Sequence, residues 1–462
     1  MQQDKIVVGL DIGTTKICVL VGRKNEYGKL EILGMGKAVS EGVSRGIVLN
    51  IDKTVDAIRR AIRQAEEQSG ISIGVVNVGI AGQHIKSAQQ FGSIIRSSAD
   101  TIGADDVNRL SQDIYRTVIQ PGSQIIHVMP QEYKVDFEGG IADPIGYEGV
   151  KLEGTFHVIT AQTTAINNIN KCVTKAGLEI SDLILEPLAS SISILSEEEK
   201  EAGVALIDIG GGTTDLAIFK DGIIRHAAVL PFGGNIITQD IRTGCQVAPG
   251  QAEQLKVKFG KAIAEEASEH EIVSIPGLPN RLPKEVSLKN LAHIIEARMA
   301  EIIELVYAEM YRMGLHDQLA AGIVLTGGGS QLHNLVQLTE YITGLETRVG
   351  YPNQHLGKTR IEAVKFPMYA TSVGLVLAGY QGLDEHNARP VYEAETTSYV
   401  PPVVQQYEPI PAVTPRPAVP APAPLPEAAK EPKGPSRAGL FFKDIISKTK
   451  GLLIDDYDDK SY

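Results

Sequence analysis

Two stretches of the sequence place an aspartate directly before a turn of glycine and threonine. "GLDIGTTKICVLVG" begins at Gly9 and "ALIDIGGGTTDLAIF" begins at Ala205, so Asp11 and Asp208 occupy equivalent places. Both patterns predict an apolar strand, a sharp turn and a second apolar strand. Such a turn directs several backbone N–H groups at one point, and its glycines let a phosphate approach the backbone closely. Each stretch therefore predicts a phosphate-binding hairpin.

The side chains beside the two turns suit a polyphosphate with a metal ion. Lys16 supplies a positive charge. Asp11 and Asp208 are placed to hold Mg²⁺ through water, because Mg²⁺ prefers a few carboxylates together with phosphate oxygens. One hairpin taken alone would be interpreted as an ordinary glycine-rich turn, whereas two copies predict a nucleotide bound between them across a cleft. Further hydroxyl donors come from Thr14, Thr15, Thr213 and Thr214.

A third glycine cluster follows a buried-strand pattern in "GIVLTGGGSQLHNL", residues 322–335. Gly327, Gly328 and Gly329 would let an adenine ring lie flat against the backbone. "LGKT" at residues 356–359 ends like a P-loop, but Pro352 stands where that loop requires its first glycine. We therefore interpret residues 356–359 as an ordinary loop.

The elements that must position these turns alternate between strand and helix patterns over roughly the first 380 residues. Residues 54–67 carry apolar side chains at helical spacing, and residues 288–312 form a second predicted helix. Such alternation indicates an α/β protein with layered sheets and helices. The 462 residues suffice for two or more domains, since a domain usually has about 100–200.

The composition argues against several classes of protein. A formal net charge of −12 argues against a non-specific nucleic-acid binder. Cys18, Cys172 and Cys245 lie far apart without CxxC spacing, which argues against a zinc site or a disulfide framework and favours a reducing compartment. No secretory leader is visible, and no apolar run approaches the roughly 20 residues of a transmembrane helix. We expect the body of the protein to lie in the cytoplasm.

The composition changes near residue 384. Thirteen of the 24 prolines fall between Pro390 and Pro435, which predicts a disordered, proline-rich tether. The segment "RAGLFFKDIISKTKGLLIDDYDDKSY" then predicts a short amphipathic helix with lysines on its polar face, typical of a helix lying in a membrane surface. Docking on the main domain or on a partner protein is the alternative. The apolar side consists of Phe441, Phe442, Ile445, Ile446, Leu452 and Leu453.

The order of the motifs resembles the ATPase superfamily of actin, sugar kinases and heat-shock chaperones. "LDIGTTK", "LEPLASS", "IDIGGGTTD" and "LTGGGSQL" look like its phosphate 1, connect 1, phosphate 2 and adenosine motifs, and "YATSVGLVLAGY" looks like its connect 2 helix. Within the superfamily, "PFGGNIITQDI", "AEQLKVKFG" and "IIEARMAEIIELV" resemble segments of the bacterial cell-division family FtsA. The amphipathic helix after a tether is similar to that family too. The resemblance covers residues 5–383 and the C-terminal helix.

This resemblance implies an actin-like α/β fold with two RNase H-like domains around a nucleotide cleft and an inserted 1C subdomain in place of the usual 1B. The implied division is subdomain 1A at residues 1–82, 162–195 and 365–383, subdomain 1C at 83–161, subdomain 2A at 196–241 and 313–364, subdomain 2B at 242–312, the disordered tether at 384–436 and the membrane-targeting helix at 437–456.

The resemblance also implies ATP and Mg²⁺ as ligands. Glu186 would orient an attacking water by analogy with the connect 1 position, although a carboxylate there also stabilises a helix dipole. Asp11 and Asp208 would hold the metal, and only slow or conditional hydrolysis is expected. Four of the implied contacts have an alternative interpretation. Residues 234 and 235 would then form an ordinary turn, and residues 253 and 256 a solvent-exposed ion pair on a helix. The implied nucleotide contacts are Gly13, Thr14, Thr15, Lys16, Gly210, Gly211, Gly212, Thr213, Thr214, Gly234, Asn235, Glu253, Lys256, Gly327, Gly328 and Gly329.

The function implied is that of an ATP-binding, self-associating adaptor at the cytoplasmic face of the cell membrane, at the division septum. It would tether the tubulin-like protein FtsZ to an anionic membrane surface and recruit other divisome proteins through 1C. Arg298 and Glu301 would contact FtsZ, unless they are solvated helix charges. The alternatives are a pilus-assembly relative, which would normally lack the tether and terminal helix, and a small-molecule kinase, whose sugar-binding residues we do not find. A chaperone would need a peptide-binding domain after the residues that resemble the superfamily.

Overall fold

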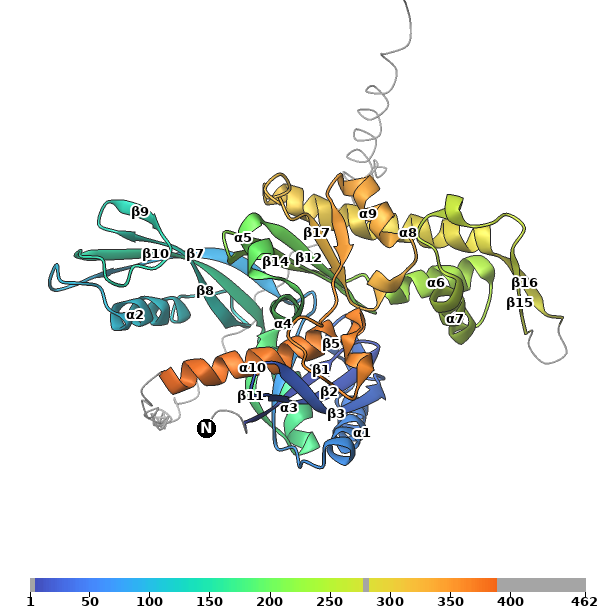
Figure 1. The fold of residues 1–462 in the computed structure, drawn as a ribbon, viewed down its shortest axis with the longest axis horizontal. Helices are drawn as coiled ribbons and strands as arrows, with labels where there is room; N and C mark the ends of the chain where they lie inside the picture. The colour runs from blue at the N-terminus through green and yellow to red at the C-terminus, as the bar shows by residue number, and fades with distance from the viewer. Residues whose placement is uncertain (1–4, 277–281, 389–462) are drawn as a thin grey trace, which may run out of the picture. The chain divides into compact units, whose positions relative to one another are not determined.

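The computed structural model describes residues 5–276 and 282–388, in which two five-stranded sheets repeat one pattern of strands (Figure 1). The strands of the first sheet are, in order, β3 (Leu30–Val39), β2 (Lys16–Lys24), β1 (Ile6–Ile12), β6 (Val75–Ile80) and β11 (Glu179–Leu185). Those of the second are β14 (Ile223–Leu230), β13 (Thr214–Lys220), β12 (Val204–Ile209), β17 (Ile323–Thr326) and β18 (Thr347–Val349). In both sheets three antiparallel strands are followed by two parallel ones. The repeated sequence hairpin is thus the central hairpin of a repeated structural unit.

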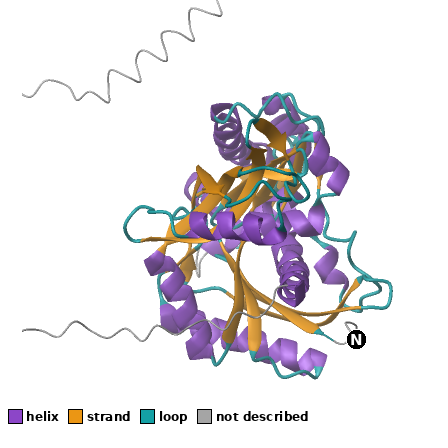
Figure 2. Ribbon diagram, turned by 90° about the vertical axis from the view of Figure 1, so that its left-hand side faces the viewer, coloured by secondary structure: helices purple, strands orange, loops and turns teal. Residues whose placement is uncertain are grey.

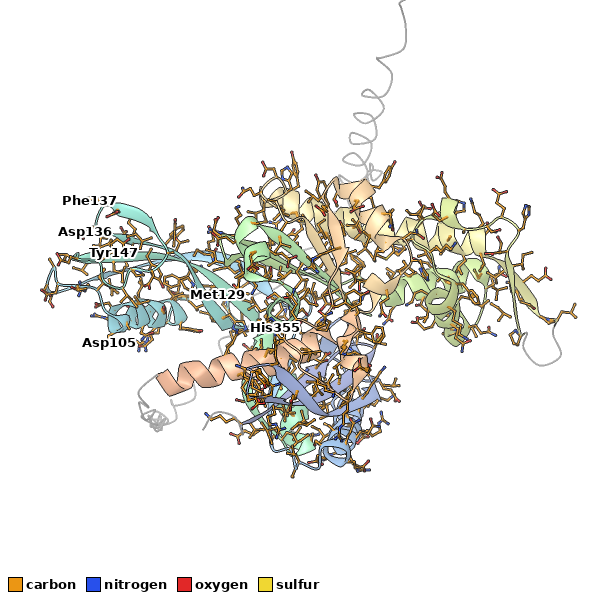
Figure 3. The ribbon with its side chains drawn as sticks, viewed as in Figure 1. Asp105, Met129, Asp136, Phe137, Tyr147 and His355 are labelled. Carbon is orange, nitrogen blue, oxygen red and sulfur yellow. The ribbon has the colours of Figure 1, made fainter. Side chains whose placement is uncertain are left out.

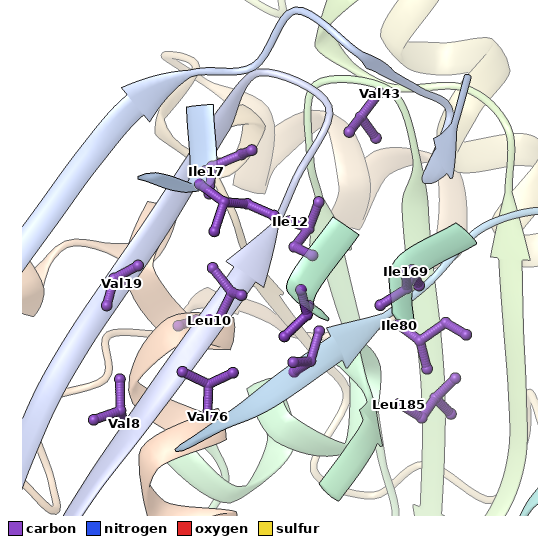
Figure 4. Packing of buried hydrophobic residues seen from close by; sticks show 14 of the residues in the cluster. Val8, Leu10, Ile12, Ile17, Val19, Val43, Val76, Ile80, Ile169 and Leu185 are labelled. Carbon is purple, nitrogen blue, oxygen red and sulfur yellow. The ribbon is translucent and has the colours of Figure 1, made fainter. Parts of the chain in front are cut away.

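The central strands β1 and β12 are apolar apart from Asp11 and Asp208, because both faces of each sheet are covered. Every residue of β12 is buried, and β1 is buried from its second residue onward. A strand buried on both faces needs no polar face, so its sequence does not alternate. Figure 4 shows Leu10 and Ile12 of β1 beside Ile17 and Val19 of β2 in this core, and helices flank the sheets in Figure 2.

The helix predicted at residues 54–67 is α1 (Ile51–Ser69), and the one predicted at 288–312 is α8 (Leu288–Arg312). Helix α1 begins where the side chain of Asn50 accepts a hydrogen bond from the Lys53 amide at 3.0 Å, and it ends at Gly70, whose φ of 71° is left-handed. The helix lies so close to β3 that a Cβ at Gly36 would be 1.7 Å from the Ala61 carbonyl oxygen. Only glycine fits there.

Between β6 and the helix α3 (Thr163–Ala176), the chain forms a separate four-stranded sheet, called the insert below. Its strands lie in the order β7 (Lys86–Ile95), β10 (Lys151–Gln162), β8 (Ser123–Val135) and β9 (Glu138–Ile141), and α2 (Ala104–Tyr115) packs against them. The insert has its own core, in which the rings of Tyr133 and Phe156 meet edge to face at 6.0 Å. Phe137 is 98% exposed at its outer end, whereas Met129 lies near the rest of the molecule (Figure 3).

The last described helix, α10 (Ala370–Ala388), completes the first lobe by packing on β1 and on α4 (Glu186–Ile194). A Cβ at Gly374 would lie 1.8 Å from the Ala189 carbonyl oxygen, so α10 and α4 are in direct backbone contact. Helix α10 extends past residue 384, where the tether was predicted to begin. The remainder of that tether and the predicted membrane helix at residues 437–456 lie outside the described residues.

The remaining elements complete the two lobes. They are β4 (Val43–Ser44), β5 (Ile47–Val48), α5 (Glu197–Ala202), α6 (Gly234–Cys245), α7 (Pro249–Phe259), β15 (Ile272–Ile275), β16 (Lys284–Ser287), α9 (Leu335–Thr343) and 3₁₀ turns at Ala264–Glu266, Gly329–Gln331, Glu362–Lys365 and Pro367–Tyr369. Within the described ranges, no helix combines the length and apolar character needed to cross a bilayer.

Candidate functional site

A cleft of about 660 Å³ is lined by both aspartate–glycine turns. Thr214 is the one residue assigned from the sequence to nucleotide binding or catalysis that does not line it, because its buried hydroxyl donates to the Phe232 carbonyl oxygen at 2.9 Å. The other assigned residues all face this cleft. They are Asp11, Gly13, Thr14, Thr15, Lys16, Glu186, Asp208, Gly210, Gly211, Gly212, Thr213, Gly234, Asn235, Glu253, Lys256, Gly327, Gly328 and Gly329.

The two turns touch each other. A Cβ at Gly211 would lie 1.9 Å from the Thr15 hydroxyl oxygen, and a Cβ at Gly212 would lie 2.6 Å from that of Thr14. Glycine is therefore required in the second turn for the threonines of the first to approach. The contact brings the backbone N–H groups of both hairpins to one end of the cleft, which is the arrangement a polyphosphate needs.

Helices α4 and α10 hold the two aspartates in place. Oδ2 of Asp208 accepts hydrogen bonds from the hydroxyls of Ser190 in α4, at 2.7 Å, and Thr371 in α10, at 3.1 Å. Oδ2 of Asp11 accepts one from Ser372 of α10 at 2.9 Å and lies 3.5 Å from Nζ of Lys16. Helices α4 and α10, where they cross, thus hold in place the carboxylate that precedes each glycine turn.

Four carboxyl groups and the ammonium group of Lys16 lie together at this end of the cleft, which Lys37 also lines. Burial, followed by the charges of Asp11, Asp215 and Asp208, raises the pKa of Glu186 well above its ordinary value. Burial also raises the pKa of Asp208, against the opposing effect of its two hydroxyl donors. Burial alone would lower the pKa of Lys16, but the carboxylates around it outweigh that effect and raise it. The site has an excess of negative charge that a divalent cation would neutralise.

Asp215 belongs to this group although the sequence analysis did not select it. It follows the second turn on β13, directly opposite Asp208 on β12. Burial and the charges of Asp208 and Asp11 raise its pKa well above the ordinary value, and its Oδ1 has no hydrogen-bond partner among the described residues. The sequence signal for it was a carboxylate inside the otherwise apolar run of a buried strand.

Glu186 is the first residue of α4. Its side chain lies against Gly79 of β6, where a Cβ would approach its Cγ to 3.0 Å and its Oε1 to 3.2 Å. The glycine therefore makes room for a carboxyl group that faces the cleft. A half-buried acid near two metal-binding candidates has the position and the basicity to orient a water molecule.

The second lobe supplies the other end of the cleft. The amides of Gly234 and Asn235, at the start of α6, donate to the carbonyl oxygens of Gly210 and Gly211 at 2.9 and 2.8 Å. Nζ of Lys256 donates to the Gly234 carbonyl at 2.9 Å and pairs with Glu253 at 2.9 Å. These four residues form one connected network on α6 and α7. Apolar side chains that the sequence analysis did not select, among them Ile237, Val257, Met299 and Leu332, also line the cleft.

The glycine cluster after β17 reaches the cleft because β17 lies parallel to β12. Gly327 has a φ of 83°, and a Cβ there would lie 2.3 Å from Oδ1 of Asp208. Both the left-handed backbone and the lack of space for a Cβ therefore require glycine at position 327. Among the described residues, no three histidine, cysteine or acidic side chains converge to hold a metal ion by themselves. Mg²⁺ would therefore depend on phosphate oxygens and water as well as on the carboxylates.

The two residues assigned to partner binding lie outside the cleft. Arg298 on α8 pairs with Asp240 of α6, with Nε 2.5 Å from Oδ2, and with Glu301 on its own helix. Its neighbour Met299 lines the cleft. The six apolar residues assigned to the membrane lie outside the described residues.

Comparison with known protein families matches two parts of the chain. Residues 205–374 match the family described as "Cell division protein FtsA", and residues 82–160 match "SHS2 domain inserted in FTSA". The cell division protein FtsA of Pseudomonas aeruginosa is 40% identical over 381 residues, which cover 82% of this chain and 91% of that protein.

Solved structures share the fold at low sequence identity. The PilM–PilN type IV pilus biogenesis complex is similar with a TM-score of 0.59 and 15% identity, over 81% of this chain and 98% of its own. MreB5 of Spiroplasma citri, in a structure bound to ADP, is similar with a TM-score of 0.50 and 15% identity, over 84% of this chain and 99% of its own. The actin-like fold with an inserted domain, expected from the sequence, is confirmed.

Proposed function

The chain belongs to the FtsA family of cell division proteins, and from this membership we propose that it is an ATP-binding adaptor of the division machinery. A role in cell division follows from the family. The proposal adds that the protein binds ATP with Mg²⁺, associates with itself, and tethers FtsZ to the cytoplasmic face of the membrane at the septum.

The observation that best supports ATP binding is the contact between the two glycine turns, in a cleft that four carboxyl groups also line. Backbone N–H groups from both hairpins suit the phosphates, and the excess negative charge suits a divalent cation. The network of Gly234, Glu253 and Lys256 suits the ribose and base. The structural neighbour MreB5 binds ADP, which supports a nucleotide in a cleft of this fold.

Hydrolysis, where it occurs, needs a positioned water and neutralised charge. When bound, Mg²⁺ would supply positive charge at the phosphates. Glu186 would hold the attacking water, and its raised pKa suits a group that accepts a proton. Asp11 and Asp208 are fixed by hydroxyl donors before any ligand arrives. We expect slow or conditional turnover, in which ATP controls assembly.

The proposed adaptor role also requires contacts with FtsZ, with other division proteins and with the membrane. Arg298 and Glu301 would bind FtsZ, and an acidic segment of that partner would compete with Asp240 for the guanidinium group. The insert would contact other divisome proteins, and Phe441 and Phe442 would enter the membrane as part of an amphipathic helix.

Titration calorimetry of the full chain with ATP and Mg²⁺ tests the nucleotide site. Asp208→Asn keeps the shape of the side chain but removes its charge, and we expect Mg²⁺-dependent affinity to fall at least tenfold. Asp221→Asn is the matched control, because Asp221 pairs with Arg225 away from the cleft. Equal affinity of wild type and Asp208→Asn would contradict the site.

Liposome flotation with and without ATP tests the adaptor role. Anionic vesicles should carry the full chain but not a chain ending at Ala388, which keeps all of α10. Phe442→Glu should also stay unbound, because it inserts a charge into the apolar side of the helix. Flotation of the shortened chain at the wild-type level would exclude the C-terminal helix as the anchor.

A further inference from the structure

Strand β8 of the insert makes hydrogen bonds to both lobes. Nε2 of His127 accepts a hydrogen bond from the backbone amide of Leu185, at the end of β11, at 3.0 Å. Four residues later, Nε2 of Gln131 donates to the carbonyl oxygen of Ile224, on β14 of the second lobe, at 2.7 Å. Figure 1 shows β8 reaching from the insert toward β11 and β14, which it contacts.

Two bulges in β8 direct these side chains. The pairing of β8 with β10 skips one residue beside His127 and skips Gln131 itself. A bulge interrupts the regular alternation of a strand and re-aims a side chain out of the sheet. The local backbone of β8 is therefore shaped to send two polar side chains out of the insert.

The partner of His127 is the residue before Glu186. Leu185 is fully buried and is the N-cap of α4, where no side chain of its own caps the helix. A buried amide at a helix start needs an acceptor, and the imidazole supplies it. Burial lowers the pKa of His127, against the smaller effect of Asp182, and this favours the neutral ring that the hydrogen bond from the Leu185 amide to Nε2 requires.

The partner of Gln131, Ile224, belongs to β14, a strand that is connected to the second-lobe side of the cleft. Strand β14 forms a hairpin with β13, which carries Asp215, and continues through Phe232 to Gly234 at the start of α6. A second contact reinforces the first, because the Ser87 hydroxyl of the insert donates to the Ala227 carbonyl of β14 at 3.1 Å. The insert therefore holds β14 at Ile224, which pairs with Phe219 at the end of the hairpin away from the turn, while the other end of β14, at Leu230, lies opposite Thr214 and leads to the cleft.

We propose that β8 is a strap between the two lobes, in which His127 is a positioning residue for Glu186 and Gln131 couples the insert to movement of the second lobe. The proposal rests on the proposed ATP site for its catalytic consequence. A partner that moves the insert would move both connections together, and a nucleotide that changes the distance between the lobes would change the strain on the insert.

The junction has the character of a contact that can separate. Oε1 of Gln131 and both ring nitrogens of the neighbouring His157 are buried without a partner in the described part of the chain. Well-packed permanent cores pair nearly all such atoms. On the far side, His226 of β14 bonds to Glu309 of α8 at 2.8 Å through Nε2, and its Nδ1 lies 3.4 Å from the Ser87 hydroxyl of the insert.

The first test replaces His127 in the full chain. His127→Leu removes the acceptor, whereas His127→Gln places an amide oxygen near the position of Nε2, and Met129→Leu is a matched control on the same strand. Hydrogen exchange without nucleotide should be faster at Leu185 and Glu186 in His127→Leu only. Single-turnover hydrolysis should slow by about 10- to 100-fold with ATP affinity changed less than threefold, and His127→Gln should recover most of the rate.

Unchanged exchange and an unchanged rate in His127→Leu would overturn the positioning role. Failure of the wild type to bind ATP would refute the proposed function instead, and the exchange measurement would still decide whether His127 holds Leu185.

The second test concerns coupling. ATP with Mg²⁺ should alter the exchange of residues 123–135 in wild type, and Gln131→Leu should abolish that response while leaving ATP binding in place. A wild-type insert that does not respond to bound ATP, or a Gln131→Leu variant that responds normally, would overturn the strap.

Discussion

Gly374→Ala should destabilise the protein although alanine is the better helix former. The glycine lies where α10 crosses α4, and a Cβ there would be 1.8 Å from the Ala189 carbonyl oxygen. That distance is well inside the roughly 3.5 Å at which non-bonded heavy atoms attract each other. The two helices must therefore separate to admit one methyl group.

The expected cost can be worked from two opposing terms. An overpacked methyl group costs about 1–3 kcal/mol, and so severe an overlap with backbone places this site at the upper end. Alanine regains about 1 kcal/mol of helix propensity. The free energy of unfolding should therefore fall by about 2 kcal/mol in urea denaturation.

Gly382→Ala is the matched control on the same helix. No atom lies within 4 Å of a Cβ at that position, so only the propensity term remains and stability should rise by up to about 1 kcal/mol. The separation should also pull Thr371 away from Asp208, and ATP affinity should fall about tenfold, since a hydrogen bond to a charged group is worth about 1.5–3 kcal/mol. If Gly374→Ala matched or exceeded Gly382→Ala in stability, the close crossing would be wrong.

Three further perturbations address the acid, the turn and the buried histidine. Stability measured in urea should fall as the pH drops from 6.5 to about 4, because burial lowers the pKa of His157 to about 4 and only the unfolded chain binds its proton in that range. The loss from this residue should reach about 3 kcal/mol, and His157→Gln should flatten the profile. Gly211→Ala should weaken ATP binding at least tenfold in calorimetry by forcing the turn away from Thr15, whereas Gly250→Ala, which meets no neighbour, should not. Glu186→Gln should slow single-turnover hydrolysis by 10-fold or more without weakening ATP binding, since glutamine keeps the size of the side chain but cannot accept a proton; an unchanged rate would exclude Glu186 as the water-orienting group.

The sequence was sufficient for the hairpins because their chemistry is local. Asp208, three glycines and two threonines stand within seven residues, and the short turn between two strands brings them together whatever the rest of the fold does. The doubling of that pattern indicated the doubled sheet. The family resemblance then predicted the actin-like arrangement and the inserted domain, which the fold comparison confirmed.

The supporting residues could not be predicted in the same way because their contacts are long-range. Ser372 looks like any helical serine in sequence, yet it bonds to Asp11 across 361 positions. Ser190 and Thr371 reach Asp208 only because α4 and α10 cross. His127 lies on a strand whose bulges have no sequence signal, so its contact with Leu185 depends on the assembled fold.

The dependence of the first lobe on α10 has a consequence for synthesis on the ribosome. At about 5–20 residues per second, β1 emerges roughly 20–70 s before the helix that covers it. During that interval Val7 and Leu20 lack the side chains of Val373 and Val376 that bury them in the finished protein. The sheet of the second lobe comes from one continuous stretch, Val204–Val349, and can close as soon as that stretch has left the ribosome. The lobe that is translated first should therefore be the one that folds last.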